Sequence, residues 1–97
     1  MTKKIKVLYV EDEQDIRETI VEILTDEGFE VIPAANGKEA VEIFLDNKPD
    51  IVVSDIMMPG VSGYDLLKII RENKNISNNN IPFIFLSALG EKQDLIK

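Results

Sequence analysis

Hydrophobic and polar residues alternate in blocks along the chain, and these blocks predict strands and helices in turn. Short apolar runs bounded by turn residues are typical of buried strands in a parallel sheet. Such runs occupy residues 4–10, 29–34, 51–55 and 81–86. Apolar residues at helical spacing follow them at residues 14–26, 38–46 and 64–73, and residues 91–97 resemble the start of a fourth helix. This alternation predicts an α/β fold with helices on both faces of a parallel sheet.

Several residues refine these elements. Gly28 is expected to end the first helix, and Asn36-Gly37 predicts a turn before the second. Pro33 cannot donate a ladder hydrogen bond, so the strand at residues 29–34 is expected at an edge of the sheet. The apolar residues of the second helix are expected to face inward; they are Ala40, Val41, Phe44 and Leu45.

Composition narrows the class of protein. Ninety-seven residues predict a single domain, residues 1–97. The net charge of −7 argues against direct nucleic-acid binding, which needs a basic face. The apolar run near the N-terminus, Val7 to Val10, is too short for a signal peptide or a membrane span, so we expect no membrane association and a cytoplasmic location. The chain has no cysteine and no histidine, which leaves carboxylates, hydroxyls and a metal to carry any chemistry.

Acidic residues stand at the ends of two predicted strands. Glu11 and Asp12 follow the first strand, Asp55 ends the third, and Ser87 follows the fourth. If these strands are neighbours, the side chains share one pocket at the carboxyl edge of the sheet, where ligands bind in open parallel sheets. Clustered carboxylates repel each other unless a cation joins them, and hard oxygen ligands suit Mg²⁺. The cluster therefore predicts a magnesium site for phosphoryl chemistry.

Structural roles alone could also explain these residues. Glu11, Asp12 and Glu13 could stabilise the N-terminus of the first helix, where the helix dipole favours acids. Asp55 could serve a turn, and Ser87 could be a cap. Only the combination at successive strand ends favours a functional site.

Three motifs give the chain a family resemblance. They are residues 7–13 (VLYVEDE), residues 49–60 (PDIVVSDIMMPG) followed by Gly63, and residues 81–88 (IPFIFLSA). With these motifs the chain resembles a response-regulator receiver domain of two-component signalling. The resemblance implies the flavodoxin-like doubly wound sheet, whose strand order in the family is 2-1-3-4-5.

The resemblance also implies a role for each site residue. Asp55 would be the phosphoacceptor that takes a phosphoryl group from a histidine kinase or a phosphotransfer protein. Glu11, Asp12 and Asp55 would hold Mg²⁺ together with the backbone carbonyl of Met57, and the Ser87 hydroxyl would sense the phosphoryl group. The apolar Met57 side chain, two residues after the acceptor, cannot orient water, so slow spontaneous dephosphorylation is expected.

The chain departs from the family pattern at its C-terminal end. No residues match the family's strand 5, helix 5 or phosphoryl-binding lysine, so we expect an incomplete receiver in which strand 81–86 is an exposed edge. Such an edge invites homodimerisation. An alternative function is therefore a non-phosphorylated receiver that acts as a dimerising interaction module. A metal-dependent phosphatase is a third reading, but that chemistry usually needs an acid where Met57 stands.

Overall fold

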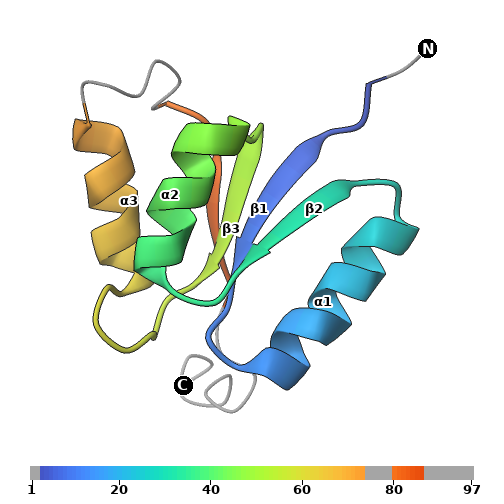
Figure 1. Cartoon of the computed structure of the whole chain (residues 1–97), viewed down its shortest axis with the longest axis horizontal. Helices are drawn as coiled ribbons and strands as arrows, with labels where there is room; N and C mark the ends of the chain where they lie inside the picture. Colours follow the sequence, from blue (N-terminus) through green and yellow to red (C-terminus); the bar gives the residue numbers. More distant parts are fainter. Residues whose placement is uncertain (1–2, 74–79, 87–97) are drawn as a thin grey trace, which may run out of the picture.

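A single parallel sheet with helices on both faces forms the described part of the protein (Figure 1). The computed structural model describes residues 3–73 and 80–86. The strands, in the spatial order β2-β1-β3-β4, are β1 (Lys6–Val10), β2 (Glu30–Ala34), β3 (Ile51–Asp55) and β4 (Phe83–Leu86). The helices are α1 (Gln14–Asp26), α2 (Gly37–Asn47) and α3 (Gly63–Glu72). The predicted fold class is confirmed, while the helix predicted at residues 91–97 lies outside the described residues.

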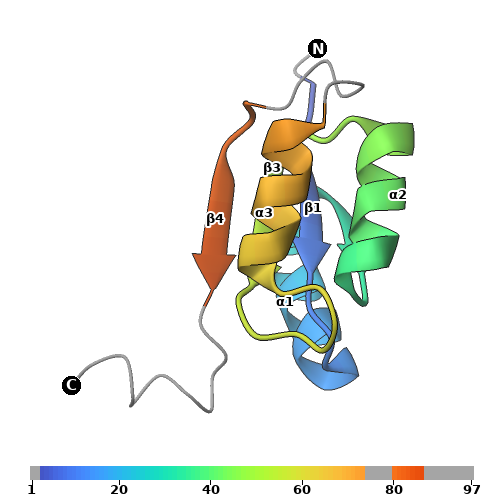
Figure 2. The same ribbon diagram turned by 90° about the vertical axis from the view of Figure 1, so that its left-hand side faces the viewer.

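The two faces of the sheet are covered unequally. Helices α2 and α3 pack on one face and α1 on the other, as the two views show (Figures 1 and 2). The alternation of side chains along a strand sends Leu8 and Val10 of β1 toward α2, while Val7 and Tyr9 occupy the face of α1. The main core lies on the α2 and α3 face and contains Leu8, Val10, Ala34, Ala40, Phe44, Val52, Met58, Leu66, Ile70 and Ile81.

Both outer strands of the described sheet have features that sequence reasoning anticipated. Of the strands that the structure describes, β2 pairs only with β1, with Pro33 opposite Tyr9, which confirms the edge position predicted from the proline. Strand β4 is the other outer strand among residues 3–73 and 80–86, and its Ile84 and Leu86 side chains are exposed. None of the helices described has the length and apolarity needed to cross a membrane.

Local hydrogen bonds set the ends of the helices. Gly28 has a φ of +100°, a left-handed conformation that ends α1 as predicted. Asn36 does more than form a turn, because its side chain accepts a hydrogen bond of 2.8 Å from the Glu39 N–H and so caps α2, which begins at Gly37. Ser62 and Asp65 form a reciprocal capping box at the start of α3.

The prediction that Leu45 faces the core is wrong. Ala40 and Phe44 are buried and Val41 packs against the core, but the Leu45 side chain is exposed. Leu45 follows Phe44 by one residue, a rotation of about 100° around the helix, which carries it out of the contact with the sheet. Helix α1 also exposes an apolar residue, Ile23, and none of its residues is fully buried.

Candidate metal and phosphoacceptor site

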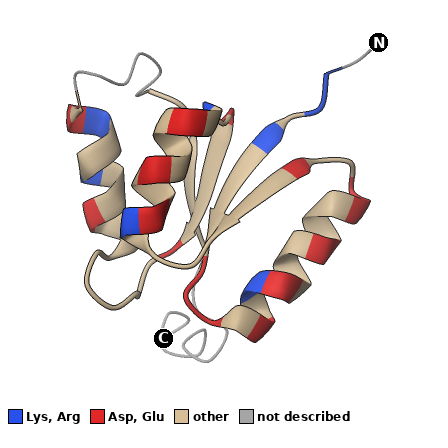
Figure 3. Cartoon of the chain, in the orientation of Figure 1, with Lys and Arg blue, Asp and Glu red and all other residues tan. Residues whose placement is uncertain are grey.

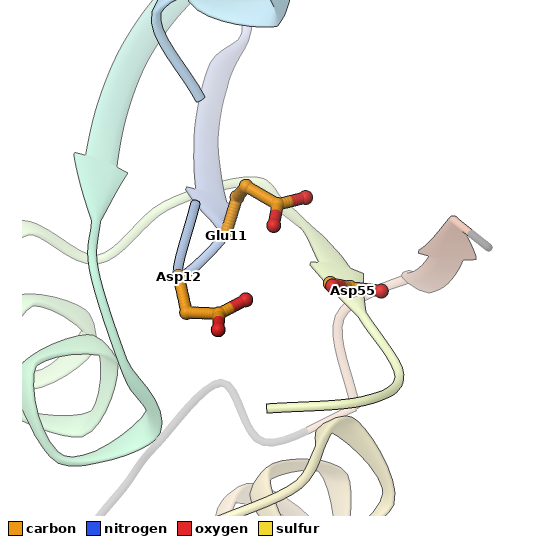
Figure 4. A group of neighbouring side chains, drawn as sticks. All are labelled: Glu11, Asp12 and Asp55. Carbon is orange, nitrogen blue, oxygen red and sulfur yellow. The ribbon is translucent and has the colours of Figure 1, made fainter. Parts of the chain in front are cut away.

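Three carboxylates meet at the carboxyl edge of the sheet. Asp55 is the last residue of β3, and Glu11 and Asp12 directly follow β1. Strands β1 and β3 are paired, with Val10 opposite Ser54, so the chain continues from Val10 into a position beside Asp55. One ligand oxygen from each of the three carboxylates lies within 4.8 Å of the others, and the side chains face a common space (Figure 4).

Of the other two predicted site residues, Met57 and Ser87, the structure describes only Met57. Asp55 pairs with Leu86 across β3 and β4, so the strand that precedes Ser87 does run beside the acids. Ser87 itself lies outside the described residues. Met57 follows Asp55 by two residues, and its side chain is 60% exposed. The neighbourhood of β1, β3 and β4, on which the predicted pocket depended, is confirmed.

Burial makes the cluster costly without a cation. Asp55 is 3% exposed and Glu11 4% exposed, whereas Asp12 is accessible to solvent. Among the described residues, Asp55 Oδ1 is a buried oxygen with no hydrogen-bond partner. A buried acceptor without a partner is unfavourable, and a hard cation is the natural ligand for several carboxylate oxygens at once. The residues present therefore fit Mg²⁺.

The pKa values of the two buried acids, Glu11 and Asp55, are both raised. The pKa of Glu11 is raised to about 7, mainly by burial and in smaller part by the nearby Asp55 and Asp12 charges, while a hydrogen bond from the Glu13 backbone lowers it. Burial also raises the pKa of Asp55, with a contribution from the Asp12 charge, against hydrogen bonds from the Ile56 and Met57 backbone. Both shifts show that ionised carboxylates are destabilised here.

Charge is distributed unevenly along the central strand (Figure 3). Lys6 is the first residue of β1 and Lys4 precedes the strand, while the acids gather at its other end. The Arg17 guanidinium of α1 reaches this end and donates a hydrogen bond of 2.8 Å to the backbone carbonyl of Glu11. Arg17 thus fixes the backbone beside the acids, and within residues 3–73 and 80–86 it forms no ion pair with a carboxylate.

Two further residues beside the acids belong to the sequence motifs but were assigned no role in the site. The Tyr9 hydroxyl donates a hydrogen bond of 3.4 Å to Glu11 Oε1. Gly63, at the start of α3, lies directly behind Asp55, and its N–H donates a hydrogen bond of 2.8 Å to the Ile56 carbonyl. Tyr9 could have been found from the strand period, because residues two apart on a strand share a face. The close approach of Gly63 has no comparable signal in the sequence.

The shifted pKa of Glu11 gives a testable pH dependence. Because the pKa of Glu11 in the folded chain, about 7, exceeds the ordinary glutamate value of 4.5, the folded chain binds more protons than the unfolded chain between these pH values. The free energy of unfolding without divalent cations should therefore fall by about 1–2 kcal/mol as the pH rises from 5 to 7.5. Urea unfolding at several pH values measures this. The Glu11→Gln variant should flatten the slope, and an equal slope in that variant would contradict the assignment.

Comparisons with known proteins agree with this architecture. The family model described as the response regulator receiver domain matches residues 7–97. A protein named "Probable transcriptional regulator ycf29" from Pyropia yezoensis is 44% identical over 92 residues, which cover 95% of this chain and 40% of the relative. Response regulator SaeR from Staphylococcus aureus is 42% identical over 90 residues, 93% of this chain and 37% of the relative.

Solved structures show the same similarity. The receiver domain of the Francisella response regulator 1452 superposes with a TM-score of 0.78 at 36% identity, covering 96% of this chain and 74% of that chain. The curated relatives are much longer, and the chain spans only about two fifths of the first of them. Receiver domains of response regulators interact with histidine kinases or phosphotransfer proteins. The family model and these relatives show that the chain belongs to the response regulator receiver domain family of two-component systems.

Proposed function

We propose that the chain is a phosphoacceptor that takes a phosphoryl group onto Asp55 in a Mg²⁺-dependent reaction. The observation that carries the proposal is the buried, unpartnered Asp55 Oδ1 at the carboxyl edge of the sheet, within reach of the Glu11 and Asp12 carboxylates. Neither a capped turn nor a simple helix N-terminus requires an acid to be buried in this way. Membership of the receiver family supports the same role.

The chemistry follows from the donor groups. An Asp55 carboxylate oxygen attacks the phosphorus of a phosphohistidine, the P–N bond breaks, and the imidazole leaves with a proton as an acyl phosphate forms on Asp55. Mg²⁺, when bound, offsets the negative charge of the phosphoryl oxygens. Glu11 and Asp12 would hold the ion with the Met57 carbonyl, and burial of Asp55 limits the access of water to the acyl phosphate.

The wider assignments belong to the same proposal. The phosphodonor would be a sensor histidine kinase or a phosphotransfer protein in the cytoplasm. The Ser87 hydroxyl would contact the phosphoryl group, and residues 1–97 would act as one domain. Some relatives carry names of transcriptional regulators, but the net charge of −7 disfavours nucleic acid as a direct ligand of this chain.

One experiment tests the central step. The chain is incubated with Mg²⁺ and a small phosphodonor such as acetyl phosphate, and the intact mass is measured before and after hydroxylamine. We expect a mass increase of one phosphoryl group that requires Mg²⁺ and that hydroxylamine removes, because hydroxylamine cleaves acyl phosphates. A chain that gains no mass at saturating Mg²⁺ would contradict the proposal.

A second candidate function is an interaction module that dimerises without phosphotransfer. The observation that favours it is the apolar surface of β4, where Ile84 and Leu86 are exposed and Ile84 lines an apolar cavity of about 460 Å³. Val7, Val53 and Ile84 are among the residues that line this cavity. The experiment above separates the two functions, since a chain that takes up no phosphoryl group and sediments as a dimer supports the second.

The exposed Met57 side chain leads to a prediction about the lifetime of the modification. A thioether cannot orient an attacking water by hydrogen bonding, whereas an amide can, so Met57→Asn should release phosphate from the modified chain about 3- to 10-fold faster. Ile69→Asn, the same kind of change at an exposed position of α3, is the control and should leave the rate unchanged. Equal rates for Met57→Asn and the native chain would refute this expectation.

A further inference from the structure

Tyr9 occupies an unusual place for a polar side chain. It lies in the middle of the sheet on the α1 face and is 1% exposed, in a run of β1 whose other members, Val7, Leu8 and Val10, are apolar. Phenylalanine would fill the same space without a hydroxyl that must find a partner. The hydroxyl of Tyr9 finds its partner in Glu11 Oε1, 3.4 Å away and also buried. The polar atom of Tyr9 is therefore directed at the candidate metal site.

The remaining atoms of Glu11 are also held. The Glu13 backbone N–H donates a hydrogen bond of 3.2 Å to Glu11 Oε2, the second oxygen of the carboxylate. The Glu11 N–H donates to the Ala34 carbonyl at 3.0 Å, and its carbonyl accepts from Arg17. The backbone and Oε2 of Glu11 are thus held by Glu13, Ala34 and Arg17, and these contacts do not depend on the side chain at position 9. Tyr9 supplies the contact to the other oxygen, and the two donors together set the plane of the carboxylate.

We propose that Tyr9 is a positioning residue that orients the Glu11 carboxylate for a divalent cation shared with Asp12 and Asp55. The inference rests on the proposed function, because it requires that the three acids bind Mg²⁺. Groups that hydrogen-bond metal ligands typically change metal affinity by about 10- to 100-fold when they are removed. The bond from Tyr9 is long, so we expect the lower end of this range.

The direct test is the Mg²⁺ affinity of the unphosphorylated chain, measured by isothermal titration calorimetry. Tyr9→Phe removes one oxygen and should weaken Mg²⁺ binding about 10-fold. Tyr64→Phe makes the same change in a side chain that is 59% exposed and packs on Phe85, and it should bind Mg²⁺ as the native chain does. Equal affinity of Tyr9→Phe and the native chain would overturn the inference.

A spectroscopic measurement keeps the test decisive if Tyr9→Phe does not fold. The chain has two tyrosines and no tryptophan, so the emission of Tyr64→Phe comes from Tyr9 alone. When a carboxylate accepts a hydrogen bond from a tyrosine, the fluorescence emission of the tyrosine changes. A cation that binds the Glu11 carboxylate should therefore change the emission of Tyr9. We expect a change that saturates with the calorimetric Mg²⁺ binding curve. Emission that is constant while Mg²⁺ binds would count against the role of Tyr9.

A double-mutant cycle distinguishes positioning of Glu11 from a general effect on the fold. If Tyr9 acts through Glu11, then Tyr9→Phe should not weaken Mg²⁺ binding further in a Glu11→Gln background. A full additional 10-fold loss in that background would overturn the inference. Failure of the native chain to bind Mg²⁺ at all would overturn the proposed metal site together with this inference. Binding that depends on Glu11 and Asp55 but not on Tyr9 would overturn this inference alone.

Discussion

Asp55→Asn should abolish uptake of the phosphoryl group and at the same time make the metal-free protein more stable. Asparagine has the shape of aspartate but is not a nucleophile toward phosphorus, so the hydroxylamine-sensitive mass gain should fall by more than about 100-fold. The same substitution removes a buried charge from beside Glu11 and Asp12. The free energy of unfolding without Mg²⁺ should therefore rise by about 1–2 kcal/mol.

The experiment is informative because phosphoryl uptake should fall while the free energy of unfolding should rise. A residue that only supported the fold would lose stability when it was changed, whereas a functional acid held at an energetic cost gains it. Asp46→Asn, the same change at an exposed position of α2, is the matched control and should alter stability by less than about 0.5 kcal/mol. A hydroxylamine-sensitive mass gain that persisted in Asp55→Asn would show that another residue accepts the phosphoryl group.

Gly63→Ala should damage both the fold and the acceptor. An added Cβ at this position would collide with the carbonyl oxygen of Asp55, and it would lie 3.0 Å from the Cα of Ile56 and 3.1 Å from a ring carbon of Phe85. Two of these neighbours are backbone atoms of the acceptor segment, which cannot move without displacing Asp55. We expect a loss of about 2–3 kcal/mol in the free energy of unfolding, despite the better helix propensity of alanine, and slower phosphorylation.

Ser62→Ala separates the collision from a general weakening of α3. It removes the side chain that accepts a hydrogen bond of 3.1 Å from the Asp65 N–H in the capping box, and adds no atom near Asp55. The loss of this cap should cost about 1 kcal/mol and leave the extent of phosphorylation unchanged. Urea unfolding and the mass assay measure both variants. A Gly63→Ala chain as stable as the native chain would contradict the predicted collision.

Most elements could be predicted because their signals are local. The strand predicted at residues 51–55 has the same bounds as the observed β3. Gly28 could be predicted to end α1 because glycine readily adopts the left-handed conformation found there. The misplaced residue, Leu45, lies at the margin of an apolar stripe. Periodicity finds the stripe but does not show how much of it the sheet covers.

The candidate site depended on information of a different kind. Glu11 and Asp12 are near Asp55 only because β1 and β3 are adjacent, and this strand order came from the family resemblance rather than from periodicity. Tyr9 was interpreted as one of a run of apolar strand residues, although the strand period places its side chain on the same face as Glu11. The role of Gly63 required knowledge of how α3 packs behind β3.

The pairing of β1 with β3 has a consequence for how a signal could leave the site. Asp55 and the acids that face it are anchored to the two central strands of the described sheet, which are joined by a continuous hydrogen-bond ladder and resist relative movement. An added negative charge at Asp55 must therefore be accommodated by the segments that enter and leave the strands. Among the segments that the structure describes, the loop from Ile56 to Ser62 is best suited to respond, because it contains the exposed Met57 and connects Asp55 to α3. The sheet would then be the fixed reference against which this loop moves.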